Sequence, residues 1–190
     1  IGPTPEILSK LGNKTEAINV VKNAKIKTIP SIIVGSQNRE ELSNAVEKIG
    51  YPIMIKASWG GGGRGMRVVY SKDELFNQIN AAKSESKKAF GKDDIFIEKF
   101  LDDVAHIEVQ ILGDSFGNII HLYERDCSLQ RRHQKIIERA PAHFLNDEVR
   151  NKLCQAAIKI GEQVNYIGAG TVEFLFDKKN NEFYFIEVNP

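Results

Sequence analysis

A run of glycines between two short apolar stretches limits what this chain can fold into more than any other feature. It lies within residues 56–66, which read Lys-Ala-Ser-Trp-Gly-Gly-Gly-Gly-Arg-Gly-Met. Glycine packs no side chain and loses much conformational entropy on folding, so such a run indicates close approach of the backbone to another group. Because glycine-rich turns bind phosphates through their N–H groups, we predict a polyphosphate ligand.

The residues around this run distinguish between phosphate-binding motifs. Gly60, Gly62 and Gly65 match the G-x-G-x-x-G spacing of a dinucleotide site, but residues 66–70 favour a short strand over the helix that this site needs. The Lys-Ser or Lys-Thr of a P-loop does not follow the last glycine. We therefore predict a strand, turn and strand that form a flap over phosphates, as in protein kinases. A flexible surface hairpin is the alternative.

Composition narrows the class of protein. The chain has 190 residues, 42% of them hydrophobic, which suffices for one sizeable core or two small lobes. Its 26 Lys and Arg residues balance 25 Asp and Glu residues, so we expect no nucleic-acid partner and no membrane partner. Cys127 and Cys154 lack the spacing of a zinc site or disulfide framework. Without an apolar span or a signal-peptide pattern, we expect a cytoplasmic protein.

The order of apolar stretches and breakers predicts an α+β fold. We expect short helices over 1–27, followed by one compact lobe in which a strand, the flap, a second strand and a helix follow one another. Capping boxes predict helix starts at Asn38 and Ser71. The expected elements are helices that follow residues 38, 71 and 146, and strands at 51–56, 66–70, 95–100, 107–112, 119–124, 171–176 and 183–188.

Two glutamates in the last predicted hairpin indicate a metal site. If the hairpin loop has an odd length and is centred on Asn180, Glu173 and Glu187 lie directly opposite each other on one face of the sheet. Opposed like charges destabilise a sheet, and a divalent ion bound through oxygens removes the conflict. Asn189 adds a neutral oxygen on the same face, so we predict a magnesium site. A shift of one residue in register would instead leave two solvated glutamates.

A buried lysine and a polar run complete the pattern. Lys56 lies in an apolar strand, where an ammonium needs an anionic partner, and we favour a nucleotide phosphate. Lys14, at a helix start, is a weaker candidate because such a lysine is usually solvated. The run from Arg125 to Lys135 is either a solvated basic loop or helix face, or a site for an anionic second substrate. In the second case Gln130 and His133 would contact ribose or phosphate. For His106, the sequence is equally consistent with a structural role and with a ligand contact.

The flap, the interior lysine and the two-carboxylate site together indicate phosphoryl transfer from ATP. In this combination the chain resembles the biotin carboxylase component of biotin-dependent carboxylases, an ATP-grasp family, over nearly its whole length. It is most similar to the component in bacterial pyruvate carboxylases, with acetyl-CoA and propionyl-CoA carboxylases as close relatives. The segments that carry the resemblance are 56–66, 98–100, 106–110, 124–135, 168–174 and 185–190.

The resemblance implies an ATP-grasp fold with a helical lead-in over 1–27, a glycine-rich lid lobe over 28–99 and part of a central antiparallel-sheet lobe over 100–190. The implied reaction is the ATP-dependent carboxylation of biotin with bicarbonate through carboxyphosphate. Its cofactors are ATP, Mg²⁺ or Mn²⁺, and biotin on a separate carrier domain. Its partners are bicarbonate, the carrier domain and a carboxyltransferase domain or subunit, and the parent protein is expected to be a homo-oligomer. The acyl acceptor is not indicated.

The resemblance also assigns roles to residues. It implies that Lys135 acts near the transferred phosphate, with Asn189 as a second catalytic residue, and that Glu173, Glu187 and Asn189 bind the metal. The residues that it assigns to the nucleotide are Lys14, Lys56, Gly61, Gly62, Gly63, Gly65, Met66, Glu98, Lys99, Leu101, His106, Gln130 and His133.

Two departures from the family pattern limit what we expect of this segment. Asn13 replaces an aspartate that the family often has before the lysine, which is a small change. The residues that the family uses on bicarbonate and biotin lie beyond Pro190, so we expect more chain on both sides and no turnover by the isolated segment. The alternatives are another ATP-grasp ligase, such as the carbamoyl-phosphate synthetase type, and an ATP-binding module without chemistry.

Overall fold

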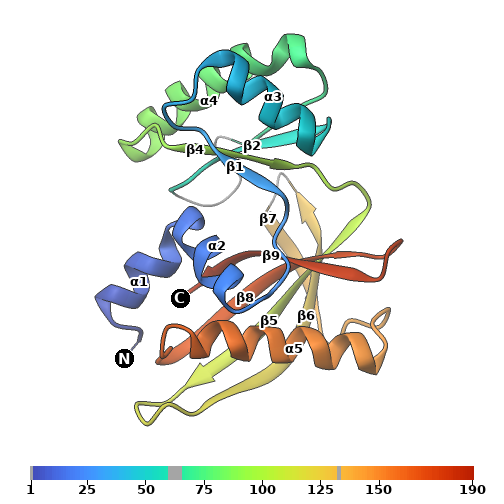
Figure 1. Cartoon of the computed structure of the whole chain (residues 1–190). Helices are drawn as coiled ribbons and strands as arrows, with labels where there is room; N and C mark the ends of the chain where they lie inside the picture. Colours follow the sequence, from blue (N-terminus) through green and yellow to red (C-terminus); the bar gives the residue numbers. More distant parts are fainter. Residues whose placement is uncertain (1, 60–65, 132–133) are drawn as a thin grey trace. The chain divides into compact units, whose positions relative to one another are not determined.

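The chain divides into two units, each with its own sheet and helices. The computed structural model describes residues 2–59, 66–131 and 134–190. The first unit comprises Ile1–Thr28 with Asp103–Pro190, and the second comprises Ile29–Asp102. Both combine α-helices with an antiparallel sheet (Figure 1), which confirms the predicted α+β class.

The second unit holds a four-stranded sheet in the order β1-β4-β2-β3, with helices α3 and α4 on one side (Figure 1). β2 is buried along its whole length because it lies inside the sheet beneath α4. In chain order the elements are β1 (Ser31–Ile33), α3 (Arg39–Ile49), β2 (Ile53–Ala57), β3 (Arg67–Val69), the 3-10 helix η1 (Lys72–Glu74), α4 (Leu75–Phe90) and β4 (Ile95–Lys99).

Side-chain caps explain where several helices begin. Asn38 Oδ1 accepts a hydrogen bond from Glu41 N at 2.9 Å, and Glu41 Oε2 accepts one from Asn38 N at 3.2 Å, which forms the predicted capping box. The box predicted at Ser71 is wrong, because Ser71 makes no capping hydrogen bond and η1 leads into α4 instead. Asn13 caps α2 by accepting from two of its backbone N–H groups, so the asparagine serves the helix start well.

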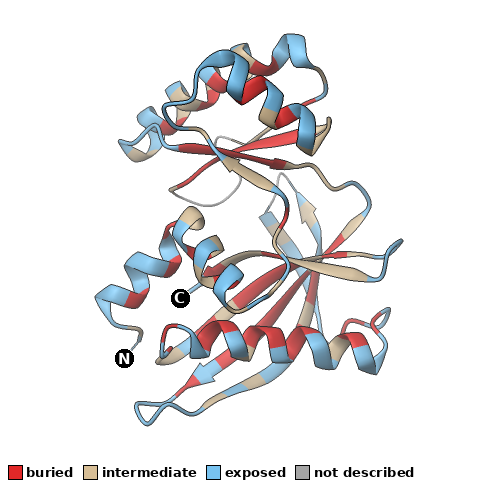
Figure 2. Cartoon of the chain, in the orientation of Figure 1, coloured by how far each residue is buried: buried red, intermediate tan, exposed pale blue. Residues whose placement is uncertain are grey.

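The first unit holds a five-stranded sheet in the order β7-β6-β5-β8-β9, all antiparallel. Helix α5 lies along one face of this sheet, and its buried side faces the strands (Figure 2). In chain order the elements are α1 (Pro5–Gly12), α2 (Lys14–Asn23), β5 (Val104–Gly113), β6 (Ile119–Arg131), β7 (Gln134–Arg139), α5 (Asp147–Glu162), β8 (Gly168–Asp177) and β9 (Glu182–Asn189).

Strand alternation separates the core of this unit from its polar face. Ile107, Val109 and Ile111 of β5 are buried in the core that α5 covers. Burial of each such side chain stabilises the fold by about 1.5–3 kcal/mol. Because successive side chains of a strand point to opposite faces, the residues between them lie on the face away from α5. That face of β5 therefore carries His106, Glu108 and Gln110.

Residues 125–131 and 134–139 form strands, so the loop or helix face considered for the basic run is wrong. β6 continues to Arg131, and β7 pairs with it at the edge of the sheet. In β7 every residue except Lys135 is exposed. An edge strand of this kind shows no apolar alternation, which is why its sequence gave no strand signal.

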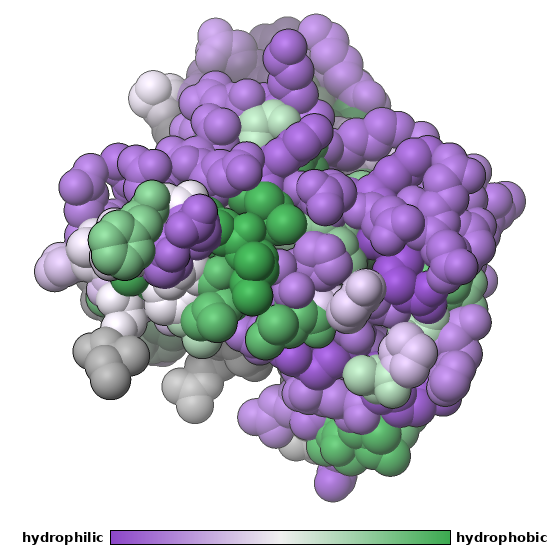
Figure 3. Space-filling model, turned by 90° about the horizontal axis from the view of Figure 1, so that it is seen from below, coloured by the Kyte–Doolittle hydropathy of each residue, from purple (hydrophilic) through white to green (hydrophobic). Residues whose placement is uncertain are grey.

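Large apolar side chains also remain exposed in the first unit. Leu112, Phe116, Ile120 and Leu122 of the β5–β6 hairpin are each more than two-fifths exposed. Figure 3 shows apolar groups gathered on the face seen from below. In the described ranges, no helix combines the length and the apolar character needed to cross a membrane.

Candidate functional site

Glu173 of β8 and Glu187 of β9 lie directly opposite each other, as predicted. The reason given for the pairing is wrong, however. Asp177 pairs with Glu182 beside the loop, so the loop has an even number of residues and is not centred on Asn180. A β-bulge leaves Ile186 without a cross-strand partner, and this extra residue brings the two glutamates into register.

Glu173 is the most enclosed acid of the site, with 3% of its side chain exposed. Its carboxylate accepts hydrogen bonds from His106 Nε2, Lys135 Nζ and Asn189 Nδ2, each at 2.6 Å. Burial by itself would raise its pKa, but the hydrogen bonds from His106 and Lys135 outweigh burial and lower the pKa of Glu173 to about 2. The side chain is therefore an anionic oxygen donor at neutral pH.

Glu187 is held by a different cation. Lys14, the first residue of α2, forms an ion pair with it. The side chains of Lys14 and Glu187 are 16% and 25% exposed. Lys14, the weaker candidate of the sequence analysis, is thus paired with a predicted metal ligand and is not a solvated side chain.

Lys135 of β7 lies between two buried acids from different strands. Its Nζ donates to Glu173 Oε1 at 2.6 Å and also forms an ion pair with Glu108. Burial disfavours the ammonium, but hydrogen bonds to Glu108 and Glu173 outweigh burial and raise the pKa of Lys135. The side chain therefore stays cationic at neutral pH.

Glu108 and Arg125 belong to this cluster. Glu108 was not among the predicted site residues, and Arg125 was considered only as part of the basic run. They are direct cross-strand partners on β5 and β6. The two charged groups lie 2.5 Å apart. The available signal was the spacing of His106, Glu108 and Gln110, which places three polar side chains on one face of an otherwise apolar strand.

His106 is oriented by Gln130. Gln130 Nε2 lies 3.0 Å from His106 Nδ1 and donates to Cys127 O at 2.9 Å. Because an amide NH₂ only donates, Nδ1 accepts and the proton resides on Nε2, which donates to Glu173. His106 thus contacts the metal-ligand candidate directly, and Gln130 supports it through His106.

The predicted residues of the second unit form a separate arrangement. Lys56 and Glu98 are 8% and 7% exposed and form an ion pair across β2 and β4. Lys56 therefore has the anionic partner that its burial requires, and in this structure that partner is Glu98. Lys99 Nζ donates to the carbonyl oxygens of Gly50 at 3.0 Å and Tyr51 at 3.1 Å.

The other predicted residues add little to the geometry. Met66 and Leu101 are half-buried in irregular segments that flank β3 and β4. Gly61, Gly62, Gly63, Gly65 and His133 lie outside the described residues.

The residues present fit a hard divalent cation. Glu173 and Glu187 offer carboxylate oxygens on one sheet face, and Asn189 lies two residues beyond Glu187. Asn189 donates through Nδ2 to Glu173, which leaves its carbonyl oxygen for another partner. One or two carboxylates with a neutral oxygen are the donors that Mg²⁺ takes from proteins beside substrate phosphates.

A second set of metal-type donors fits less well. Glu108, Cys127 and Glu138 bring ligand atoms within 4.8 Å of one another. Glu108 is already bound by Arg125 and Lys135. Burial, followed by the charge of Glu108, raises the pKa of Cys127 to about 12, so the thiol resists the deprotonation that a metal ligand needs.

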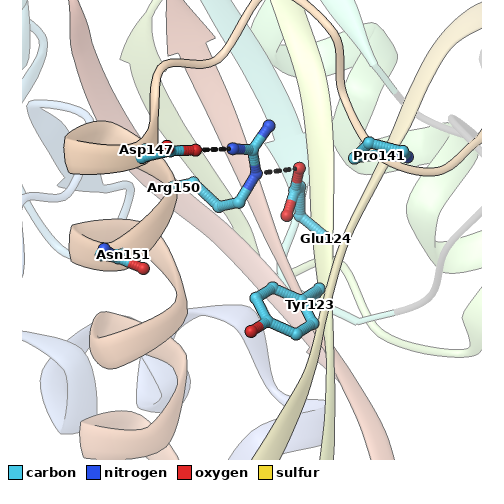
Figure 4. Close-up of a pocket in the computed structure, with 6 residues that line it drawn as sticks. All are labelled: Tyr123, Glu124, Pro141, Asp147, Arg150 and Asn151. Atoms are coloured by element: carbon cyan, nitrogen blue, oxygen red, sulfur yellow. Dashed lines mark hydrogen bonds and ion pairs between the residues drawn. The ribbon is translucent and has the colours of Figure 1, made fainter.

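A pocket of about 470 Å³ in the same unit contains none of the predicted site residues. Arg150 reaches from α5 to buried Glu124 and to Asp147, and the ring of Tyr123 lies beside them (Figure 4). The remaining lining residues are Pro141 and Asn151. This arrangement ties α5 to β6 and does not belong to the Glu173 cluster.

Comparison with known proteins identifies similar chains. The family described as carbamoyl-phosphate synthase L chain, ATP binding domain, matches residues 13–190. Pyruvate carboxylase of Bacillus subtilis is 53% identical over 194 residues, and the match covers 100% of this chain and 16% of that protein. Biotin carboxylase of a Nostoc species is 48% identical, with 100% of this chain and 42% of that protein covered. The chain thus spans less than half the length of these relatives.

Solved structures agree with these matches. The biotin carboxylase of Campylobacter jejuni, in a complex described as β-γ-ATP, has a TM-score of 0.93 at 46% identity, over 99% of this chain and 42% of that one. The biotin carboxylase domain of Hydrogenobacter thermophilus 2-oxoglutarate carboxylase, solved with MgADP, ADP and bicarbonate, has a TM-score of 0.93 at 42% identity. That match covers 99% of this chain and 41% of the other.

Proposed function

This chain belongs to the carbamoyl-phosphate synthase L chain ATP-binding domain family and has the ATP-grasp fold, and we propose that it is part of a biotin carboxylase. The proposed reaction is the carboxylation of biotin with bicarbonate at the expense of ATP. Relatives named biotin carboxylase or pyruvate carboxylase, 48% and 53% identical to it, support this choice. The parent protein is then a ligase.

The observation that carries the proposal is the convergence of Lys135, Glu173 and Asn189, with Glu187 opposite Glu173. Three strands, β7, β8 and β9, supply these side chains. The cluster combines anionic and neutral oxygen donors with a lysine that stays cationic. Phosphoryl transfer needs both, because charge must be neutralised and the reacting groups positioned.

The residues divide the work as follows. Glu173 and Glu187, with Asn189, would hold Mg²⁺ or Mn²⁺. That ion, when bound, supplies positive charge to the phosphates of ATP. Lys135 stabilises the negative charge of the phosphoryl group as it passes to a bicarbonate oxygen, which yields ADP and carboxyphosphate. His106, oriented by Gln130, holds Glu173 in place, and Lys14 does the same for Glu187.

We further propose that the second unit is the lid lobe. Biotin would be presented to the site on a separate carrier domain. We also propose that the parent protein is a cytoplasmic homo-oligomer that works with a carboxyltransferase domain or subunit. The residues proposed to serve the nucleotide are Lys14, Lys56, the glycines of 61–65, Met66, Glu98, Lys99, Leu101, His106, Gln130 and His133.

ATP cleavage by the full-length protein tests the proposed function. We expect phosphate release with MgATP to require bicarbonate and to rise further with free biotin. Removal of the divalent ion with EDTA should abolish the release, and Mn²⁺ should restore it.

Each rival function gives a different result in this assay. A carbamoyl-phosphate synthetase type ligase would respond to ammonia and ignore biotin. A binding module would bind MgATP without releasing phosphate. Either result would refute the proposed reaction.

A further inference from the structure

We propose that Arg125 is a positioning residue that acts on Lys135 through Glu108. The inference rests on the proposed function, in which Lys135 stabilises the transferred phosphoryl group. In the part of the chain that the structure describes, the recorded polar contacts of Arg125 are to Glu108, Gln110 and Glu138. None of these three is assigned to nucleotide or metal, and the recorded contact that leads from Arg125 to the site is the one with Glu108, which also binds Lys135.

Glu108 links the arginine to the lysine. Arg125 donates through Nε to Glu108 Oε1 at 2.5 Å, and Lys135 Nζ binds the other oxygen, Oε2. Each carboxylate oxygen thus has its own cation. As long as Arg125 occupies Oε1, the carboxylate cannot turn without losing a charged hydrogen bond, and Oε2 stays directed at Lys135.

Gln110 fixes the arginine in turn. Nη1 and Nη2 of Arg125 both donate to Gln110 Oε1 at 3.2 Å. Gln110 Nε2 donates to the carbonyl oxygen of Gly170 on β8 at 2.9 Å. The guanidinium is therefore held on two sides by groups from β5, and the amide of Gln110 extends the network to the strand that carries Glu173.

The geometry of this network requires a guanidinium. Its donors lie in one plane and reach Glu108 and Gln110 at the same time, whereas a lysine ammonium is a single point with no fixed fork. Glu108 is 3% exposed, so little water is available to replace a lost donor. Glu108 is shared by two cations, Arg125 and Lys135. Its negative charge is therefore not balanced by the lysine ammonium alone.

The test uses the full-length protein and the variants Arg125→Met and Arg125→Lys. We expect Arg125→Met to lower kcat for bicarbonate-dependent ATP cleavage roughly 10- to 100-fold, the size of effect that a small misplacement of a reacting group produces. Binding of Mg²⁺ with a β,γ-imido ATP analogue, measured by calorimetry, should stay within about twofold of the parent value. Arg125→Lys should recover part of kcat, because it restores a cation on Glu108 without the fork to Gln110.

Arg139→Met is the matched control. Arg139 also pairs with a buried acid of β6, Asp126, at 2.6 Å. Asp126 follows Arg125 directly in the strand and therefore points to the opposite face of the sheet. We expect this variant to keep its kcat, which separates loss of the Glu108 contact from loss of a buried ion pair in general.

A double variant shows whether Glu108 is the link. If Arg125 acts through Glu108, adding Arg125→Met to Glu108→Gln should lower kcat no further than Glu108→Gln alone. Independent, multiplying effects would overturn the proposal, as would an unchanged kcat in Arg125→Met or an equal loss of analogue binding.

A variant that does not fold and a parent protein without the proposed activity have different consequences. If Arg125→Met does not fold, Arg125→Lys carries the test, and an unchanged kcat in it would overturn the proposal. A parent protein whose ATP cleavage ignores bicarbonate would overturn the proposed function instead of the role of Arg125.

Discussion

Glu173 and Glu187 face each other across β8 and β9 but differ in how deeply they are held. The side chain of Glu173 is 3% exposed and has three hydrogen-bond donors, whereas that of Glu187 is 25% exposed and pairs with Lys14. One acid is thus part of the packed sheet face and the other is accessible. Substitution of the accessible acid separates binding chemistry from folding.

Glu187→Gln in the full-length protein should lower Mg²⁺-dependent ATP turnover by about 100-fold or more, because a charged metal ligand is lost while the shape is kept. Its melting temperature should change little, since Glu187 is partly exposed. Phosphate release and a thermal melt measure the two effects. The control is Glu182→Gln. It changes another glutamate of β9, one that pairs with Lys27, and should keep full turnover. Unchanged activity in Glu187→Gln would refute the metal assignment.

Arg150→Met should destabilise the first unit by about 3 kcal/mol, because it leaves buried Glu124 without its cation. Glu124 would keep one donor, the backbone N–H of Ala142 at 3.1 Å. Urea unfolding followed by circular dichroism measures the change. Lys152→Met removes an exposed pair with Glu148 on the same helix and should cost less than about 1 kcal/mol. Equal losses in both variants would contradict this account.

Gly170→Ala should destabilise the sheet by about 1–3 kcal/mol through overpacking. A Cβ at Gly170 would collide with the ring and hydroxyl of Tyr166, which is buried and donates to Ala169 O. Gly12→Ala is the matched control, because a Cβ there meets nothing within 4 Å and the residue is helical. We expect it to leave stability unchanged or to raise it by about 0.5–1 kcal/mol. Thermal melts of both variants measure these changes in stability.

Both thiols should resist alkylation in the folded protein. Burial, with the charge of a nearby glutamate, raises the pKa of Cys127 to about 12 and that of Cys154 to about 11. At pH 8 the reactive thiolate would then be about one part in ten thousand or one in a thousand, compared with a substantial fraction in an unfolded chain. Mass spectrometry after iodoacetamide treatment, with and without urea, measures this difference. Fast labelling of the native protein would contradict the burial of both residues.

Features that depend on neighbours in the chain were predictable. Asn38 and Glu41 lie three residues apart, and this spacing alone indicated the start of α3. The glycine run, Lys56 and the acids of the last hairpin pointed to ATP chemistry, and the family resemblance that they carry is confirmed by the comparisons. Local spacing suffices in such cases because the interacting groups are fixed by helix or strand geometry.

The register at Glu187 depended on more than local spacing. The predicted pairing is right, but it results from the bulge at Ile186 and an even loop, not from an odd loop. A bulge forms where packing on both sides of a strand favours it, so its position cannot be read from turn residues. The strands of the basic run were missed for a related reason, because edge strand β7 has no buried face to leave an apolar pattern.

The amino-acid order by itself determined the class of fold and the start of α3 at Asn38, and it indicated a chemical type for the site, since each follows from residue type and short spacing. Only the tertiary structure decided which charges meet. Arg125 and Glu108 are 17 residues apart and Lys135 and Glu173 are 38 apart, and each pair is brought together by strand order in the sheet. Buried charges are stable only with partners, and those partners are chosen by the packing of distant strands.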